Sequence, residues 1–414
     1  MLITRRAALA AAALAPFAPA VLRAAEPDLS SLASLTDAVP PIAPAERAAR
    51  LAKAQELMRR HGIGAVLIEP SASLVYFTGV RWSRSERLTA AVLPRDGEPL
   101  IVTPFFEEPS VRETLAVPAD LRVWQEHEDP ARVVAGFLRE RGLAAQPIAV
   151  EETAGFFAFD GLRRALPDAR LVSADPVVRA CRMIKSPAEI ALMQAASDVT
   201  VAAYRWTWPR IEVGMTGAEI GAMMNAATRR LGGDPQFALV LVGEASAYPH
   251  GTKAVHRVAP GQVVLMDCGC TVQGYQSDIS RTGVFGRPSA KIARVWAHMA
   301  EGQRIAFAAA RPGTPAGQVD DAVRRYYVSQ GYGPDYRLPG LSHRTGHGIG
   351  LDGHEPVNLV RGETTPLRPG MCFSNEPGLY LPGEFGIRLE DCLYMTEGGP
   401  KYFSKPPTSI EQPV

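Results

Sequence analysis

The sequence predicts an α/β protein of two domains, the second of which contains two similar halves. A chain of 414 residues is long enough to build two separate hydrophobic cores. Before about residue 180, short apolar runs alternate with helical stretches, and beyond it a pair of segments repeats the same order of helix, strand and acidic residue. Hydrophobic residues make up 46% of the chain, which is typical of a soluble globular protein.

Residues 1–25 have the layout of an export signal. Arg5 and Arg6 precede an apolar run over residues 7–22, which is too short to span a bilayer comfortably. Paired arginines before a mildly apolar, alanine-rich run are typical of a twin-arginine signal, and Ala18-Pro19-Ala20 supplies a small-residue cleavage site. We therefore expect a periplasmic or secreted protein without a membrane anchor. If the signal does not function, the protein stays in the cytoplasm.

Residues 46–180 are expected to form the smaller, N-terminal domain. An amphipathic helix is predicted over 46–60, where it stops at His61-Gly62, and another over 130–141. The remaining signals are the short apolar runs AVLIEP, LVYFTG, TAAVLP, PLIVTP and IAVE. Such runs, separated by helical or polar stretches, indicate a mixed sheet with helices packed on it.

Residues 183–404 are expected to form the larger, C-terminal domain. Ser186 and Thr216 each precede a Glu by three residues, which is the pattern of a capped helix start. Strands are predicted in FALVLVG, QVVLMD and SDISRTGVFG, and further helices over 291–310 and 319–330. The tail, residues 405–414, is expected to be disordered or bound at an interface.

The C-terminal domain carries a weak internal repeat. The Pro-Gly pairs at 260–261 and 369–370 precede Asp267 and Glu376 by the same interval. Each of these strands is predicted to end in its acid, cross a turn and return with a second acid. Two halves related by a pseudo-twofold axis would bring two carboxylate hairpins to one site at their junction.

Four carboxylates and two imidazoles predict a metal site in this domain. The residues are Asp267, Asp278, Glu376, Glu390, His347 and His354. They stand in otherwise apolar or glycine-rich segments, where four negative charges would repel each other and lose hydration. Two divalent ions remove that cost, and carboxylate with imidazole suits manganese, iron, cobalt or zinc. Such a pair lowers the pKa of a shared water and polarises a carbonyl, which is the chemistry of amide hydrolysis.

Other residues near these motifs have both a catalytic and an ordinary interpretation. His250 and His354 are candidates for holding substrate or stabilising an oxyanion, although His250 follows Tyr248-Pro249 and is also compatible with a plain loop residue. Arg388 is expected to pair with Glu390 and orient it, without a direct catalytic role. The five cysteines are expected to act as small hydrophobic residues, and a disulfide is left open.

Taken together, the motifs MDCG, GYQSDISRT, HRTGHGIGLDGHEP, SNEPGLY and GIRLED resemble the pita-bread metallopeptidases, in the Xaa-Pro dipeptidase and aminopeptidase P branch. The resemblance implies a pita-bread catalytic domain of two pseudo-symmetric halves, preceded by a smaller α/β creatinase-like N-terminal domain. It also implies a homodimer and two divalent metal ions, with manganese as our first choice and cobalt, zinc or iron as the others.

The same resemblance assigns roles to individual residues. Asp278 and Glu390 correspond to ligands that bridge both ions. His250 and His354 correspond to histidines on the substrate side, with His354 at the scissile carbonyl, and Glu376 is the candidate for accepting a proton from the bridging water. The complete set of implied metal ligands is Asp267, Asp278, His347, Glu376 and Glu390.

The expected substrate is a short peptide that is cleaved before proline. A bond to proline is a tertiary amide without an N–H, so a closed pocket that fits the ring suits it better than a groove that binds extended strands. We favour a dipeptidase over an aminopeptidase. A lyase or amidohydrolase that acts on small molecules with the same fold is the alternative. Gly353 stands where relatives often carry a larger apolar residue, which leaves the size of the substrate open.

A role in binding nucleic acid or histones is disfavoured. The formal net charge is only +1, and the charged residues are interspersed along the chain. The acidic ligand set is also intact, which a pure binding module on this fold would not need.

Overall fold

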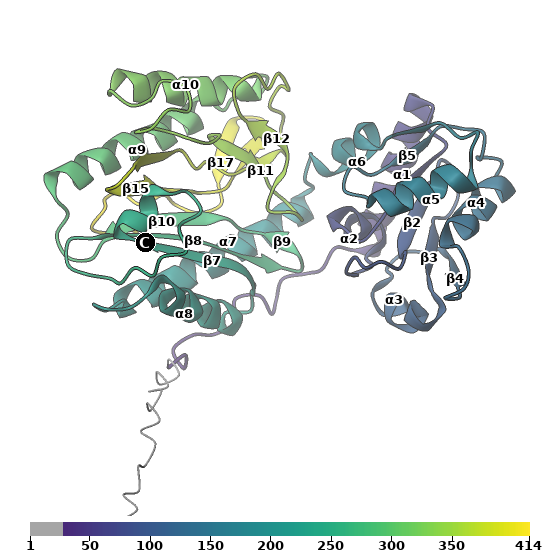
Figure 1. Ribbon diagram of the computed structural model, residues 1–414, viewed down its shortest axis with the longest axis horizontal. Helices are drawn as coiled ribbons and strands as arrows, with labels where there is room; N and C mark the ends of the chain where they lie inside the picture. Colours follow the sequence, from purple (N-terminus) through teal and green to yellow (C-terminus); the bar gives the residue numbers. More distant parts are fainter. Residues whose placement is uncertain (1–27) are drawn as a thin grey trace, which may run out of the picture.

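Residues 28–414 are described in the computed structural model, and they form two lobes that lie side by side (Figure 1). The predicted export signal, residues 1–25, lies outside these residues. Among the helices that are described, none has the length and apolar character needed to cross a membrane.

The N-terminal lobe is built on a six-stranded sheet in the order β4-β3-β2-β1-β5-β6. β2 is antiparallel to its neighbours β1 and β3, and the other pairings are parallel, so the sheet is mixed as predicted. The strands are β1 (Ala65–Ile68), β2 (Ala90–Pro94), β3 (Leu100–Pro104), β4 (Asp120–Trp124), β5 (Ile148–Val150) and β6 (Leu171–Ser173).

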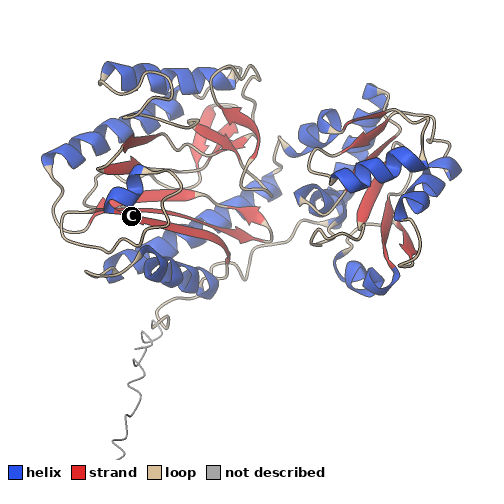
Figure 2. Cartoon of the chain, in the orientation of Figure 1, coloured by secondary structure: helices blue, strands red, loops and turns tan. Residues whose placement is uncertain are grey.

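Helices cover both faces of this sheet (Figure 2). In β1, Val66 and Ile68 pack with α1, α2 and α6, whereas Ala65 and Leu67 pack with α4 and α5. Because both faces are covered, the inner strands β1, β2 and β5 are apolar along their whole length, and they appear in the sequence as continuous apolar runs. The helices are α1 (Pro44–His61), α2 (Ala72–Thr78), η1 (Phe105–Glu107), α3 (Glu108–Thr114), α4 (Pro130–Glu140), α5 (Phe156–Ala165) and α6 (Asp175–Arg182).

The first half of the C-terminal lobe begins with two capped helices. Ser186 and Thr216 each accept a hydrogen bond from the backbone of a Glu three residues on, and the carboxylate of each Glu accepts one in return, so both predicted capping boxes are present. These helices pack on an antiparallel sheet of order β10-β8-β7, with β9 paired to β8. The elements are α7 (Pro187–Thr207), η2 (Trp208–Arg210), α8 (Gly217–Arg230), β7 (Asp234–Val242), η3 (Gly243–Ala247), β8 (Val263–Val272), β9 (Tyr275–Gln276) and β10 (Ile279–Val284).

The second half repeats this arrangement with a second helix pair. Its five-stranded sheet has the order β12-β11-β13-β16-β17, and β14 and β15 form a separate hairpin. In Figure 1 the helix pairs of the two halves lie on opposite sides of the strands, which is the two-halved pita-bread architecture. The elements are α9 (Ala290–Ala309), α10 (Ala316–Ser329), β11 (Gly346–Gly348), β12 (Glu355–Leu359), β13 (Cys372–Phe373), β14 (Gly378–Leu381), β15 (Phe385–Arg388), β16 (Leu393–Thr396) and β17 (Gly399–Tyr402).

One detail of the predicted repeat is wrong. β8 does not end at Asp267 but continues to Val272, because the small residues that follow go on pairing with β7. In the second half, β13 ends at Phe373, and Glu376 lies in an irregular stretch before Pro377, which has no N–H to join a ladder. Asp267 is therefore held inside a strand, and Glu376 is not.

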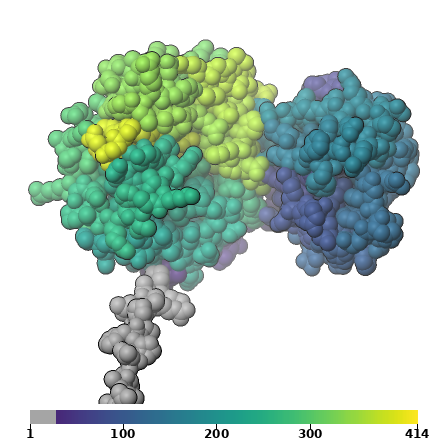
Figure 3. Space-filling model, viewed as in Figure 1, coloured from purple at the N-terminus to yellow at the C-terminus, as the bar shows by residue number. Residues whose placement is uncertain are grey.

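The tail is held on the C-terminal lobe rather than disordered. Ile410 is 4% exposed and packs in the core beneath α9 and α10. The Ser404 hydroxyl, just before the tail, donates a hydrogen bond to Asp391. Figure 3 shows the last residues, in yellow, against the surface of this lobe.

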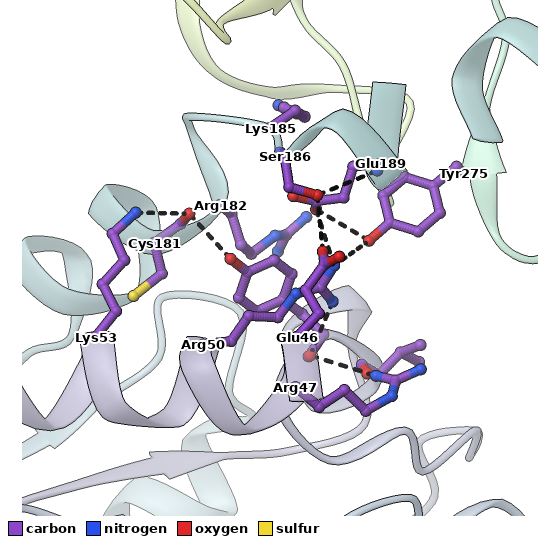
Figure 4. A network of polar contacts seen from close by, with 12 residues as sticks. Glu46, Arg47, Arg50, Lys53, Cys181, Arg182, Lys185, Ser186, Glu189 and Tyr275 are labelled. Atoms are coloured by element: carbon purple, nitrogen blue, oxygen red, sulfur yellow. Dashed lines mark hydrogen bonds and ion pairs between the residues drawn. The ribbon is translucent and has the colours of Figure 1, made fainter. Parts of the chain in front are cut away.

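A buried polar network joins the two lobes (Figure 4). Arg50 of α1 donates to the Tyr275 hydroxyl at 3.0 Å and lies 3.5 Å from the carboxylate of Glu189. Across the same boundary, the Ser186 hydroxyl donates to Glu46 at 2.7 Å. The first helix of the N-terminal lobe is therefore bound to the first helix and the β9 strand of the C-terminal lobe.

Candidate metal centre and active site

Asp267 and Asp278 come from the first half of the C-terminal lobe. Asp267 lies in the middle strand β8, opposite Ser280 of β10 and Leu239 of β7. Asp278 lies in the short connection from β9 to β10 and is 7% exposed. Because β8 and β10 are antiparallel neighbours, both carboxylates reach the same cavity.

His347, Glu376 and Glu390 come from the second half. His347 is the middle residue of β11, Glu376 follows β13, and Glu390 follows β15. The backbone N–H of Glu390 donates to the carbonyl of Ser280 at 3.0 Å, which attaches this segment to β10 of the first half. The acids of the two halves thus meet at the junction between them.

The structure brings the five predicted ligands and His354 into one cluster. Their candidate ligand atoms form three overlapping groups, and within each group the atoms lie within 4.8 Å of one another. The groups are Asp278 with His347 and His354, His347 with Glu376 and Glu390, and Asp267 with Asp278 and Glu390. Carboxylates with one imidazole suit hard or borderline divalent cations.

Two carboxylate oxygens of the cluster are buried without a hydrogen-bond donor. They are Oδ1 of Asp267 and Oε1 of Glu390. A buried acceptor that is left unpaired loses its hydration without compensation, and native proteins rarely tolerate it. Both residues belong to the groups described above, so a cation bound there would satisfy these oxygens.

His347 presents a lone pair to this cluster. Its Nδ1 lies 3.0 Å from the Gly348 carbonyl, which can only accept, so the proton is on Nδ1. Nε2 then faces Oε1 of Glu376 at 3.4 Å and Oδ2 of Asp278 at 3.7 Å. Burial, followed by the charge of His354, lowers the pKa of His347 to about 3, so the ring is neutral and acceptors face acceptors. Neutral imidazole nitrogen and carboxylate oxygens with free lone pairs are the ligand atoms that metal binding requires.

Three carboxylates of the cluster, those of Asp278, Glu376 and Glu390, have raised pKa values. Burial raises the pKa of Asp278 well above its usual range, and the charges of Asp267 and Glu376 raise it further. The pKa of Glu390 is also raised well above its usual range, first by burial and then by Asp278. Burial raises the pKa of Glu376 to about 7. The cluster therefore holds more negative groups than the protein compensates by itself.

Arg388 lies at the site, but its partner is not the one predicted. Nη2 donates to Oδ2 of Asp267 at 2.6 Å, and Nη1 donates to the Tyr380 hydroxyl at 2.9 Å. Arg388 is linked to Glu390 through Ser280, whose hydroxyl donates to Oε2 of Glu390 at 2.9 Å and accepts from Nε of Arg388 at 3.0 Å. The expected pairing with Glu390 is wrong because β15 packs against β8, which places the guanidinium beside Asp267.

A buried ion pair holds the backbone next to Glu390. Arg281 donates to both carboxylate oxygens of Asp391, at 2.6 and 3.2 Å, and to the carbonyl of Glu390 at 2.9 Å. Gln303 of α9 donates to the same Asp391 carboxylate at 3.1 Å. Because each acceptor has a partner, this pair fixes the segment that carries Glu390.

The cluster lines a cavity of about 750 Å³. His250 is exposed at its rim, and the ring of His354 stands with its centroid 4.1 Å from that of His347, at an interplanar angle of 77°. A side-chain carbon added at Gly353 would meet no atom within 4 Å, so there is free space beside His354. The apolar lining consists of Phe237, Leu239, Pro249 and Val360.

Sequence reasoning did not single out three polar residues around this cavity: His343, Arg344 and Tyr380. Nδ1 of His343 donates to the Arg344 carbonyl at 2.7 Å, so Nε2 accepts from the Tyr380 hydroxyl at 2.8 Å. A chain of hydrogen bonds thus runs from Arg388 through Tyr380 to His343. The position of His343, four residues before His347 in one motif, was the available signal. Tyr380 had none, because a tyrosine in a strand is usually a core residue.

All five cysteines are free and buried. Cys268 and Cys270 belong to the core under α7 and α8, as do Cys372 and Cys392. They therefore act as small core residues, and the disulfide that the sequence left open is not formed.

Comparison with known proteins agrees with this geometry. Residues 191–397 match the family model described as metallopeptidase family M24, and residues 50–184 match that of the creatinase/prolidase N-terminal domain. A protein of Mycobacterium bovis named probable dipeptidase PepE is 35% identical over 356 residues, which covers 85% of this chain and 92% of that protein.

Two further relatives have the same extent. The Xaa-Pro dipeptidase of Lactobacillus helveticus is 31% identical over 86% of this chain and 96% of its own length. The crystal structure of dipeptidase PepE from Mycobacterium ulcerans superposes with a TM-score of 0.82 at 34% identity, covering 90% of this chain and 99% of that one. The similarity therefore extends over both lobes.

Proposed function

The chain belongs to metallopeptidase family M24, and from that premise we propose that it is a metal-dependent Xaa-Pro dipeptidase. The observation that carries the proposal is the meeting of four carboxylates and a neutral imidazole in one cavity, with acceptor atoms facing each other. The names of the relatives support the substrate class, since one of them is called an Xaa-Pro dipeptidase.

We propose two divalent ions, with manganese as the first choice because a carboxylate-rich donor set suits hard to borderline cations and availability decides among them. When bound, they would lower the pKa of a water toward neutrality and polarise the scissile carbonyl. The residues that would hold them are Asp267, Asp278, His347, Glu376 and Glu390.

The chain's own side chains would position the substrate and move the proton. Oε1 of Glu376 accepts a hydrogen bond from Ser374 at 3.3 Å, and this carboxylate is the group proposed to take a proton from the attacking water. An imidazole N–H of His354 would donate to the carbonyl oxygen as negative charge develops on it. His250, at the rim, would also hold the substrate.

Arg344 is the candidate for selecting dipeptides. It lines the cavity and donates to Oδ1 of Asn358 at 3.0 Å, and it makes no ion pair within residues 28–414. Its free charge would bind the terminal carboxylate of Xaa-Pro, while the apolar lining accepts the proline ring. We expect Arg344→Met to raise KM for Ala-Pro far more than for Ala-Pro amide. An equal rise for both would reject this role.

The central test is hydrolysis by the purified protein after metal removal and reloading with Mn(II). Ala-Pro, Ala-Ala and Ala-Pro-Ala are the substrates, and Asp278→Asn is compared with Asp321→Asn, which alters an acid on the outer helix α10. We expect metal-dependent cleavage of Ala-Pro alone, lost only in Asp278→Asn. Cleavage of the first bond of Ala-Pro-Ala would make the protein an aminopeptidase. No cleavage of any peptide by folded, metal-loaded protein would favour the small-molecule lyase or amidohydrolase.

Two further proposals come from the sequence alone. We propose that residues 1–25 direct export, which a fusion to a reporter with and without Arg5 and Arg6 tests by fractionation. We also propose a homodimer, which light scattering on the purified protein tests; a monomeric mass at micromolar concentration would reject it.

A further inference from the structure

The loop between β11 and β12 carries His354, and the next residue anchors it. Glu355 is 5% exposed, and its carboxylate accepts from Nζ of Lys185 at 2.9 Å and from Nη2 of Arg182 at 2.5 Å. The same carboxylate accepts from the backbone N–H of Asp352 at 3.2 Å. Three donors therefore hold one buried acid at the end of this loop.

Both cations come from the connection between the lobes. Arg182 ends α6 of the N-terminal lobe, and Lys185 lies just before α7, where its backbone N–H donates to Gly370 at 2.8 Å. Arg182 also donates to the Ser73 hydroxyl of α2 at 2.9 Å and to the Asp352 carboxylate at 2.8 Å. Figure 4 shows both cations at the lobe junction, next to the network of Arg50, Glu189 and Tyr275.

The loop packs directly on this ion pair. A carbon added at Gly350 would lie 2.8 Å from Oε1 of Glu355 and 2.8 Å from Cε of Lys185. The backbone N–H of Gly350 also donates a hydrogen bond to the Asp352 carbonyl at 3.0 Å, and its carbonyl accepts one from the backbone N–H of Gln276 at 2.8 Å. The loop therefore has little room to move unless Glu355 moves with it.

Among the described residues, His354 has no hydrogen-bonded anchor of its own, and its ring packs edge-on against that of His347, with 4.1 Å between the centroids. Its imidazole is exposed and makes no side-chain hydrogen bond within the described range of the chain. Glu355 does not line the 750 Å³ cavity, but both residues line a neighbouring pocket of about 420 Å³ together with Arg182. The place of His354 in the cavity therefore depends on its packing against His347 and on the backbone that Glu355 holds.

We propose that Glu355 is a positioning residue for His354. Through Arg182, this position also depends on how the N-terminal lobe packs against the C-terminal lobe. The proposal rests on the proposed function, because it concerns the histidine that would contact the scissile carbonyl. A small displacement of such a group weakens interactions that exist only in the transition state, so it lowers kcat more than it raises KM.

A double-mutant cycle separates this role from a general structural one. Glu355→Gln should lower kcat for Ala-Pro by about 10- to 100-fold, with KM and metal content nearly unchanged. In a His354→Ala background the same substitution should change kcat by less than about twofold, because the group it positions is absent. An equal loss in both backgrounds would overturn the proposal.

Arg182→Gln provides a second cycle if Glu355→Gln fails to fold, and it should show the same dependence on His354. Arg179→Gln is the matched control, since Arg179 lies one turn earlier on α6 and pairs with the exposed Glu152. It should leave kcat and KM as in the wild type. A loss in Arg179→Gln as large as in Arg182→Gln would assign the effect to the helix in general.

A readout without turnover makes the two proposals distinguishable. The imidazole C–H signals of the eight histidines are compared by NMR, with that of His354 identified from His354→Ala. The His354 signal should shift in Glu355→Gln and Arg182→Gln and stay in place in Arg179→Gln. If the wild type cleaves no peptide, the proposed function fails while this spectrum still tests the positioning. An unmoved signal in both variants would reject the positioning.

Discussion

Asp278 and Glu390 of the metal cluster are buried to a degree similar to that of Glu355 at the lobe junction, yet the pKa values move in opposite directions. Asp278 is 7% exposed, Glu390 2% and Glu355 5%. Burial and neighbouring carboxylates raise the pKa values of Asp278 and Glu390. Burial acts on Glu355 in the same sense, but Lys185 and Arg182 outweigh it and lower its pKa to about 2.

The difference shows where each charge is compensated. Glu355 receives two cations from the chain itself, so it is complete in the folded protein. The cluster of four carboxylates has the guanidinium of Arg388 beside it, and two of its oxygens have no donor among the described residues. An acid group of the first kind stabilises a fold, whereas one of the second kind requires an external cation.

The largest expected effect is on the cluster. Asp278→Asn removes a proposed shared ligand, so we expect the loss of bound metal and a fall in kcat/KM for Ala-Pro of at least about a thousandfold. Metal content is measured by mass spectrometry of the dialysed protein. Without metal, the variant should be no less stable than the wild type, because a repelling charge has been removed. A variant that keeps both ions and its activity would contradict the assignment.

At Glu355, removal of the charge is expected to lower the stability of the metal-free protein, opposite to the effect expected at Asp278. Its pKa of about 2 lies below the ordinary value of 4.5, so its contribution to stability is complete above pH 4.5 and is lost as the pH falls toward 2. The shift corresponds to about 3 kcal/mol. In urea unfolding of the metal-free protein, the wild type should have a higher free energy of unfolding than Glu355→Gln at pH 5. This difference should shrink by about 3 kcal/mol when the pH is lowered to 2.

Three charged groups face Glu355 and bear on this comparison. They are Lys185 and Arg182, which pair with its carboxylate, and Asp352, which shares Arg182 but is exposed. Glu384→Gln, which removes an exposed acid paired with Lys291, is the control and should show no such narrowing. A gap that stays constant with pH would mean that Glu355 stabilises the protein by packing and not by charge.

How far the sequence predicts this molecule depends on the range of the interactions. Ser186 and Thr216 mark helix starts correctly because a capping box is complete within four residues. The proposed ligands could be found from the sequence because an acid in an apolar run, such as Asp267 after VVLM, is rare unless it binds a cation. The partner of Arg388 was predicted incorrectly, and the ion pair of Glu355 was not foreseen, because Arg182 and Glu355 lie 173 residues apart. Such contacts exist only after the lobes and halves have packed.

A smaller effect is expected at Arg388, which borders the cluster without belonging to it. Arg388→Met removes the donor to Asp267 and the link through Ser280 to Glu390. Outer contacts of this kind change metal affinity by about 10- to 100-fold. We expect calorimetry to show weaker Mn(II) binding in Arg388→Met than in the wild type, and an intermediate affinity in Arg388→Lys. Unchanged affinity in Arg388→Met would show that Asp267 is held by its strand alone.

The smallest effect is expected where neither burial nor crowding operates. Arg59 and Asp96 form an ion pair at 2.8 Å, with side chains 50% and 68% exposed. Water solvates both partners before and after folding, so Asp96→Asn should change the free energy of unfolding by less than about 1 kcal/mol, and salt should reduce even that. If this substitution cost as much as Glu355→Gln in the same urea experiment, cation pairing alone would explain Glu355. Its burial between the lobes would then have no part in the comparison.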